Sequence, residues 1–164
     1  MPRIRLRLDV KTPVFGDSVR AQGYVAASEV VSGTQRALPH SLAKRMRCKP
    51  GLSVLSTETV RRVNDCAVAL SIDYFRRDRL DGVIDTIVET GSVSRALAQH
   101  GVTSYQRDHT SYETRLPTAH EALLLGIPRQ QPVYVTVGAN VAEDGTVVQL
   151  SKGVWRGDCV IYQI

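Results

Sequence analysis

The cysteines and histidines are the residues of this sequence with the widest chemistry, as nucleophiles, redox groups or metal ligands. Cys48, Cys66 and Cys159 lie far apart and form no CxxC pair, so the sequence encodes neither a zinc ribbon nor a thioredoxin-like motif. His120 precedes Glu121, but no second histidine follows at the spacing of an HExxH motif. The pattern therefore predicts no metal site, no cofactor and no catalytic residue, with the thiols as buried structural groups in a reducing compartment.

A second set of polar side chains could bind a small molecule by hydrogen bonds and stacking. Gln149, Ser151 and Trp155 share one parity in the last strand-like stretch, so they point to one face of a sheet. Ser92 opens a helical pattern at the position where serine caps the helix, among free backbone amides. These residues are candidates for ligand contacts, although core packing for Trp155 and simple capping for Ser92 are the plain alternatives.

Length and composition indicate one soluble domain. The chain has 164 residues, of which 43% are hydrophobic and 23% charged, as is ordinary for globular proteins. No signal-peptide pattern and no apolar run of membrane-spanning length occurs, so we expect a cytoplasmic protein without membrane contact.

The net charge of +5 is unevenly distributed, because residues 1–47 carry nine Lys or Arg against three Asp or Glu. Arg3, Arg5 and Arg7 alternate with apolar residues, which favours a solvated strand face over a DNA-binding arm.

The elements that must position these side chains form an α+β pattern. Strands are expected near 3–10, 24–31, 53–63, 67–75, 105–114, 132–141 and 146–163. Helical patterns cover 37–46, 81–90, 92–101 and 117–126.

An internal repeat organises these elements. RALPHSLAKRM and a strand–turn–strand segment ending in DYFRRD recur about 79 residues later as RLPTAHEALLLG and a segment ending in VWRGD. In the second copy, Glu143-Asp144-Gly145 is a strong hairpin signal. Two similar helix–hairpin halves are therefore expected to join into one antiparallel sheet with helices over one face, leaving a ligand cleft between helices and sheet.

The stretches TRLPTAHEALLLGIPRQQPV (114–133), NVAEDGTVV (140–148) and WRGDCV (155–160) resemble the UTRA domain of the HutC branch of GntR-type transcription regulators. TGSVSRALAQHGVTSYQRDHT (90–110) is similar, more narrowly, to the phosphonate-metabolism repressors called PhnF. The resemblance covers about residues 8–164.

The resemblance implies a chorismate-lyase-like fold, mainly an antiparallel sheet covered by helices, in a homodimer. It implies one domain over residues 1–164, with 1–8 as a possible linker remnant. DNA would be bound only through a winged-helix domain that is not part of this sequence. The small-molecule partner of the family is a metabolite, often anionic, for which arginine and hydroxyl donors are suited.

The resemblance also suggests ligand contacts. Arg62 matches a phosphate-contacting arginine, and its usual companion two residues earlier is replaced by Val60, with Arg61 on the opposite strand face. Ser92, with Ser94 beside it, matches an anion-contacting serine. Thr12 stands in a Thr-Pro-Val-Phe sequence where relatives read Thr-Arg-Phe.

In the last strand, Gln149 and Trp155 replace a glutamate and a tyrosine that contact sugar phosphates in relatives, and Ser151 lies between them. Tyr74 ends the matching strand of the first half and is a weaker candidate.

Three functions follow from these observations. The first is an effector-sensing and dimerisation domain that binds a phosphonate, phosphate or phosphate ester and modulates operator binding. The second is a chorismate-lyase-like enzyme, which Gln149 disfavours because that enzyme has a catalytic glutamate on its late strand. The third is a dimerisation module with a degenerate pocket.

Overall fold

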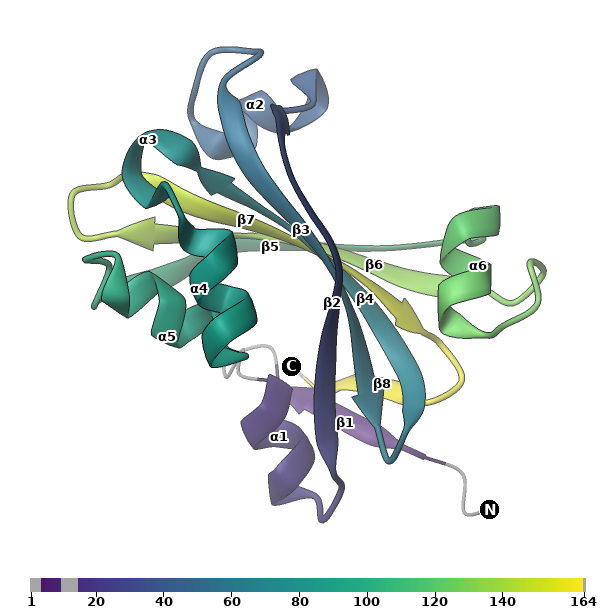
Figure 1. Cartoon of the computed structure of the whole chain (residues 1–164). Helices are drawn as coiled ribbons and strands as arrows, with labels where there is room; N and C mark the ends of the chain where they lie inside the picture. Colours follow the sequence, from purple (N-terminus) through teal and green to yellow (C-terminus); the bar gives the residue numbers. More distant parts are fainter. Residues whose placement is uncertain (1–3, 10–14, 164) are drawn as a thin grey trace.

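The computed structural model describes residues 4–9 and 15–163, arranged as a long antiparallel sheet with helices packed on it (Figure 1). The six strands of this sheet, in spatial order, are β2 (Ala26–Ala37), β3 (Ser53–Val63), β4 (Cys66–Arg76), β7 (Val147–Arg156), β6 (Val133–Ala142) and β5 (Tyr105–Arg115). The helices are α1 (Phe15–Ala21), α2 (His40–Met46), α3 (Arg77–Leu80), α4 (Val83–Thr90), α5 (Val93–Gln99) and α6 (Ala119–Leu125). A separate two-stranded sheet pairs β1 (Leu6–Asp9) with β8 (Val160–Gln163).

The strand order is symmetric about the contact between β4 and β7. Each half runs strand, helix, hairpin: β2, α2, β3 and β4, then β5, α6, β6 and β7. The first hairpin turns at Asn64 and Asp65, both with positive φ, and the second at Gly145. All pairings within the six-stranded sheet are antiparallel. The predicted duplication and the α+β class are confirmed.

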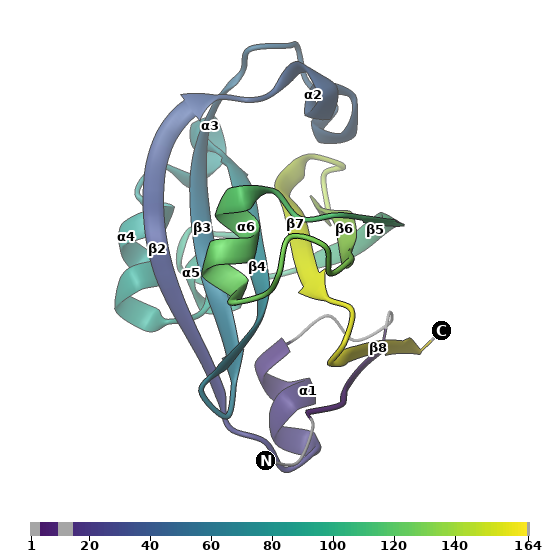
Figure 2. The same cartoon turned by 90° about the vertical axis from the view of Figure 1, so that its right-hand side faces the viewer.

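Helices cover both faces of the sheet, whereas the repeat alone led us to expect them on one. In Figures 1 and 2, α6 lies on the side opposite α4 and α5. Helices α2 and α6 cover one face, over Val54, Leu70 and Leu150, among other apolar residues. Helices α3 to α5 connect the two halves and pack on Leu55 and Phe75 of the other face. The segment between the halves therefore supplies a second helical layer that the repeat does not contain.

The last expected strand, 146–163, is two strands. The chain leaves the main sheet after Arg156, whose guanidinium pairs with Asp158 at 2.8 Å, and continues as β8 alongside β1. Leu6 and Leu8 are buried in one apolar cluster with Val19 of α1, Val63 of β3 and Val160 of β8. Arg5 and Arg7 are exposed, as expected for a solvated strand face, and Arg3 lies outside the described residues.

The short helices α1 and α3 were not predicted. Helix α1 has seven residues and buries only Phe15 and Val19, so its sequence holds a single i, i+4 pair and no extended period. Helix α3 has four residues and is too short to produce a periodic signal.

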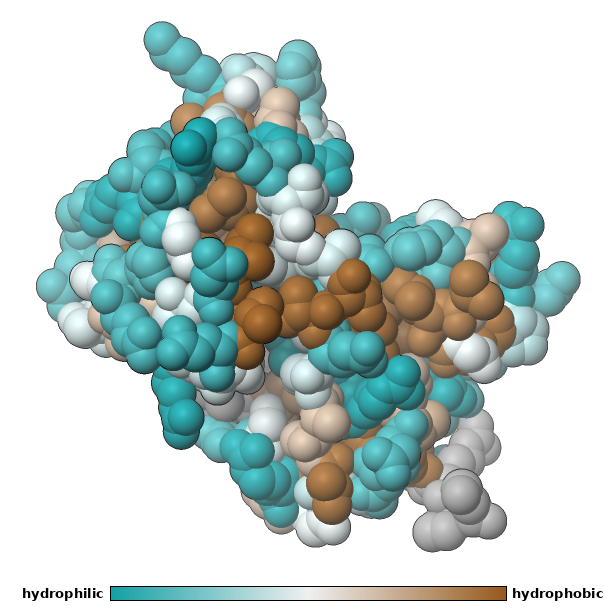
Figure 3. Space-filling model, viewed as in Figure 1, coloured by the Kyte–Doolittle hydropathy of each residue, from teal (hydrophilic) through white to brown (hydrophobic). Residues whose placement is uncertain are grey.

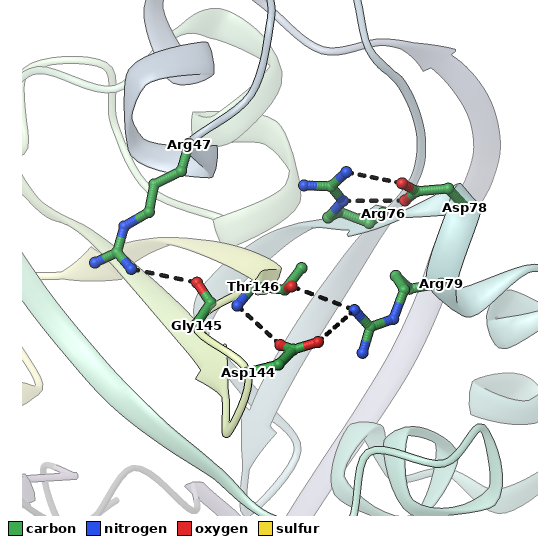
Figure 4. Close-up of polar contacts among 7 residues, drawn as sticks. All are labelled: Arg47, Arg76, Asp78, Arg79, Asp144, Gly145 and Thr146. Carbon is green, nitrogen blue, oxygen red and sulfur yellow. Dashed lines mark hydrogen bonds and ion pairs between the residues drawn. The ribbon is translucent and has the colours of Figure 1, made fainter.

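Two arginines, one after α2 of the first half and one in the connecting helix α3, hold the hairpin tip of the second half (Figure 4). Asp144 accepts a hydrogen bond from the Thr146 backbone amide at 3.0 Å and from Arg79 Nη1 at 2.8 Å. Arg47, after α2, donates to the Gly145 carbonyl at 3.4 Å. The hydrogen bonds from Thr146 and Arg79 lower the pKa of Asp144 to about 2, the Thr146 amide having the largest effect. The tip is thus fixed by residues far away in the sequence.

Across residues 4–9 and 15–163, no helix combines the length and apolar character needed to cross a membrane. The same residues contain no group of three or more His, Cys, Asp or Glu arranged to hold a metal ion.

Candidate functional site

A cavity of about 850 Å³ lies against the face of the sheet that is not covered by α2 and α6. Its floor is formed by β3, β4, β7, β6 and β5, and its walls by α1, β2 and the segment joining α4 to α5. This is the cleft between helices and sheet that the repeat predicted. Among its lining residues, the polar or charged ones contributed by the five floor strands are Thr59, Arg61, Ser71, Asp73, Gln149, Ser151, Thr136, Asn140, Tyr105, Arg107, Thr110 and Tyr112.

Arg61 of β3 reaches into this cavity from one side. Its Nε donates to Ser71 Oγ at 2.7 Å, and its guanidinium carbon lies 5.2 Å from the centre of the Phe15 ring. Burial lowers the pKa of Arg61; nearby Asp73 opposes this effect and nearby Arg107 adds to it. One donor is therefore used to orient the side chain, and the two terminal amino groups have no hydrogen-bond partner among the described residues.

Arg107 of β5 enters from the other side of the floor. A register shift between Arg107 and Thr110 interrupts the pairing of β5 with β6, a bulge of the kind that redirects side chains. The Arg107 side chain crosses over Gly138, where any Cβ would collide with Nη1. Its buried Nε has no partner within the described part of the chain, and burial lowers its pKa while Asp73 opposes the effect.

Three buried polar side chains form a relay across the centre of the floor. Asn140 Nδ2 donates to Gln149 Oε1 at 2.7 Å, and Gln149 Nε2 donates to Asp73 Oδ1 at 2.8 Å. This relay crosses the contact between the two halves, because Asp73 is on β4 and Gln149 on β7. The centre of the floor is thus built from buried polar side chains joined by hydrogen bonds.

Aromatic rings close one end of the cavity. Trp155 lies over Gly153, where a Cβ would collide with its Nε1, and this nitrogen donates to Thr136 Oγ1 at 3.1 Å. The Tyr162 ring of β8 meets Trp155 edge-on at 6.0 Å. The two floor glycines, Gly138 and Gly153, leave the space that Arg107 and Trp155 occupy.

The segment between α4 and α5 supplies hydroxyl groups to the opposite wall. Ser92 caps α5, its Oγ accepting from the Arg95 backbone amide at 3.3 Å. Ser94 Oγ lies 3.2 Å from the Tyr105 hydroxyl. Both serines line the cavity.

The structure brings together six of the nine candidate residues predicted from the sequence: Arg61, Ser92, Ser94, Gln149, Ser151 and Trp155. Thr12 lies outside the described residues.

Arg62 and Tyr74 do not line the cavity, which corrects the ranking of Arg62 as the first candidate. Successive strand residues alternate between the two faces of a sheet. Because Arg61 points into the cavity, Arg62 points to the other face. Arg62 instead donates to the Asp65 carbonyl of its own hairpin turn at 3.3 Å. Tyr74 is buried with α2 on the other face, and burial raises its pKa.

The prediction missed Asp73, Arg107 and Asn140. Asp73 could have been found as a lone carboxylate in the apolar strand AVALSIDYF, since charged residues are rarely buried without a reason. Gly138 and Gly153, inside strands, indicated a close approach to the backbone. The entry of Arg107 depends on the bulge in β5, for which the sequence gives no signal that we recognise.

Comparison with known proteins gives a consistent family. Residues 21–160 match the UTRA domain. The repressor PhnF of Mycolicibacterium smegmatis is 24% identical over 157 residues, which cover 96% of this chain and 63% of the relative. The repressor NagR of Bacillus subtilis is 22% identical and covers 88% of this chain and 59% of its own length. The chain thus spans less than two thirds of these curated relatives.

Solved structures show the same fold. The crystal structure of PhnF from Mycobacterium smegmatis has a TM-score of 0.88 at 21% identity, covering 97% of this chain and 70% of that one. The effector domain of the same protein has a TM-score of 0.86 at 22% identity, covering 96% of both chains. The expected fold is confirmed. The curated relatives are named as transcriptional regulators or repressors, which favours the sensing alternative over the chorismate-lyase one. The chain therefore belongs to the UTRA domain family.

Proposed function

We propose that this chain is the effector-sensing and dimerisation domain of a HutC-branch repressor concerned with phosphonate metabolism. Its ligand is a small anionic metabolite, a phosphonate, phosphate or phosphate ester. Binding changes the operator affinity of winged-helix domains attached to the same protein. This requires that the ligand binds one of two domain conformations more tightly than the other.

The observation that carries the proposal is the pair of arginines in one cavity. Arg61 and Arg107 come from opposite sides of the floor, and burial lowers the pKa of both. Neither makes an ion pair with a residue that the structure describes, and Arg107 Nε lacks even a neutral partner there. Burying charges in this way is costly unless a counter-charge arrives. A tetrahedral anion with several acceptor oxygens supplies that charge and accepts from both guanidinium groups.

A dimerisation module with a degenerate pocket is the remaining alternative. Such a pocket would be filled by its own side chains. The open volume of about 850 Å³, which remains although Arg107 and Trp155 fill the space above Gly138 and Gly153, favours the sensing function.

The dimer is supported by exposed apolar surface. Hydrophobic side chains gather near the middle of the molecule and over α6 (Figure 3). Val31, on the edge strand β2, is 40% exposed and Leu123 of α6 is 78% exposed. Sedimentation equilibrium of the wild-type chain and of Leu123→Ser tests this part: we expect a dimer that the substitution weakens, and a monomer at all concentrations contradicts it.

Ligand binding can be followed without a label, because Trp155 is the only tryptophan of the chain and lines the cavity. We expect inorganic phosphate, alkylphosphonates or sugar phosphates to change its fluorescence and to release or absorb heat in isothermal titration. Arg107→Gln and Arg61→Gln should each weaken binding by roughly 10-fold or more, the value of a hydrogen bond to a charged group.

Arg62→Gln is the matched control, since its side chain comes from the same strand and does not line the cavity. It should leave the affinity unchanged. The proposal fails if no anion gives a signal, or if Arg62→Gln weakens binding as much as Arg61→Gln does.

A further inference from the structure

Asp73 is a feature that a purely anionic ligand does not explain. Its side chain is buried, with the residue only 1% exposed, yet it lines the cavity. It accepts a hydrogen bond from the neutral amide of Gln149, and no Lys, Arg or His nitrogen among the described residues lies within ion-pair distance. Arg61 and Arg107 are near enough to be influenced by its charge, but they do not contact it. A buried carboxylate in this condition lacks its counter-charge.

The relay from Asp73 has a fixed direction. An ionised carboxylate can only accept hydrogen bonds, so Gln149 must present its NH₂ group to Asp73 and its carbonyl oxygen to Asn140. Asn140 must then use its own NH₂ group toward Gln149. The relay therefore leaves the carbonyl oxygen of Asn140 as its free end.

That free end is an unused acceptor. Asn140 Oδ1 is buried and has no partner in the described part of the molecule. Asn140 faces the cavity from β6, directly opposite Arg107 of β5, and Asp73 is paired across the strands with Ser151. One region of the floor thus offers acceptors in need of donors, whereas the guanidinium groups of Arg61 and Arg107 are donors in need of an acceptor.

We infer that the ligand is a zwitterion, with a phosphonate or phosphate group held by Arg61 and Arg107 and a primary ammonium group held by Asp73 and Asn140. An ammonium carries three donors and a positive charge, enough for the carboxylate, the amide oxygen and Ser151 Oγ. The floor has two positive groups and one negative group, which matches a dianionic acid joined to one amine. This inference rests on the proposed function and specifies the ligand class of the same site.

The first test compares two isosteric ligands on the unmodified chain. In 2-aminoethylphosphonate an ammonium occupies the place of the terminal methyl group of n-propylphosphonate. We expect the amine to bind at least ten times more tightly, measured by Trp155 fluorescence and isothermal titration. Glucosamine 6-phosphate and glucose 6-phosphate form a second pair with a larger carbon skeleton. In whichever pair binds, we expect the ligand that carries the amine to bind at least ten times more tightly than its partner.

The second test removes the carboxylate. Asp73→Asn should abolish the preference for the amine while leaving the affinity for the uncharged isostere equal or higher. Glu113→Gln is the control, because Glu113 is exposed on β5 and does not line the cavity; it should preserve the preference. Thermal unfolding of each variant shows whether it is folded, and the ligand pairs on the wild-type chain need no variant.

The outcomes separate the two proposals. If the amine and its isostere bind equally well, anion sensing stands and the zwitterion is wrong. If neither member of either pair binds but inorganic phosphate does, anion sensing stands and the zwitterion is wrong. If none of these anions binds, both proposals are overturned. If Asp73→Asn weakens both members alike, Asp73 serves only to position the floor through Gln149, and the inference is overturned although the site remains.

Discussion

The two faces of the central sheet are built by the same strands and serve different purposes. On the face under α2 and α6, buried side chains are apolar, as at Leu70, Leu150 and Val154. The residues next to them in the sequence, which point to the cavity face, are Ser71, Ser151 and Gly153. Ser71 is 3% exposed and Leu70 0%. The degree of burial therefore does not distinguish the faces; the polarity of the buried groups does. Apolar packing stabilises both faces, under α2 and α6 on one and at Leu55 and Phe75 under α3 to α5 on the other, but only the second gathers buried hydrogen-bonding groups around a cavity.

The largest expected effect comes from substituting two residues that are adjacent in the sequence but lie on opposite faces of the sheet. Leu70→Ala should lower the free energy of unfolding by about 2–5 kcal/mol, as for other buried leucines, because it leaves a cavity under α6. Ser71→Ala should cost about 1 kcal/mol or less in stability, but weaken phosphonate binding by freeing Arg61 Nε. Urea denaturation and fluorescence titration measure both quantities. Equal losses of stability in the two variants would refute the distinction between the faces.

Filling the floor should affect binding more than folding. Gly153→Val places a branched side chain where Trp155 Nε1 and Thr136 Oγ1 now lie, so the ring must move and the cavity shrinks. We expect the affinity to fall by about 10-fold or more, with overpacking costing about 1–3 kcal/mol in stability. Lys152→Val, on the opposite face of the same strand, is the control. If Gly153→Val leaves the ligand affinity unchanged, Trp155 does not contribute to the binding site.

The two capped helices allow a finer comparison. Thr118 caps α6 in a complete capping box with Glu121, and Ser92 caps α5 at the cavity wall. Thr118→Ala and Ser92→Ala should each cost about 1 kcal/mol of stability. Only Ser92→Ala should also weaken ligand binding. If titration shows equal affinities for both variants, Ser92 is a cap and nothing more.

The smallest effect concerns the hairpin tip, away from both faces. The pKa of Asp144 is lowered to about 2, below the value of about 4 for an unfolded aspartate. Its contribution to stability is therefore complete above about pH 4 and is lost as the pH falls toward 2. The midpoint of thermal unfolding of Asp144→Asn should lie slightly below that of the wild type at pH 6 and converge with it near pH 2. A constant difference over this range would exclude the ionised carboxylate as the cause.

The fold was largely predictable because its signals are local and occur twice. The Leu-Pro helix starts, the Asp-Gly turn and the alternating strands fix two hairpins, and the spacing of the copies implies that they pair. The site was predictable only in part. Strand parity placed Gln149, Ser151 and Trp155 together, but placed Arg62 wrongly, because a resemblance to a phosphate-binding position outweighed the alternative at Arg61. Arg107 was missed because the bulge that directs it arises from the pairing of β5 with β6, a tertiary event.

The symmetry of the sheet has a consequence for how the domain responds. Arg61 belongs to the first duplicated half and Arg107 to the second, and the hydrogen bond between Gln149 and Asp73 joins the halves beneath them. A molecule held by both arginines would add a noncovalent link between the two halves. The β4–β7 strand pair, the packing of α2 on β7 and of α6 on β4, and side-chain contacts such as Arg47 with Asp108 already join them. If the proposed ligand binds there, its occupancy would restrict the relative twist of the two halves, and its release would permit that twist. The cavity would then convert the concentration of a metabolite into a change of shape.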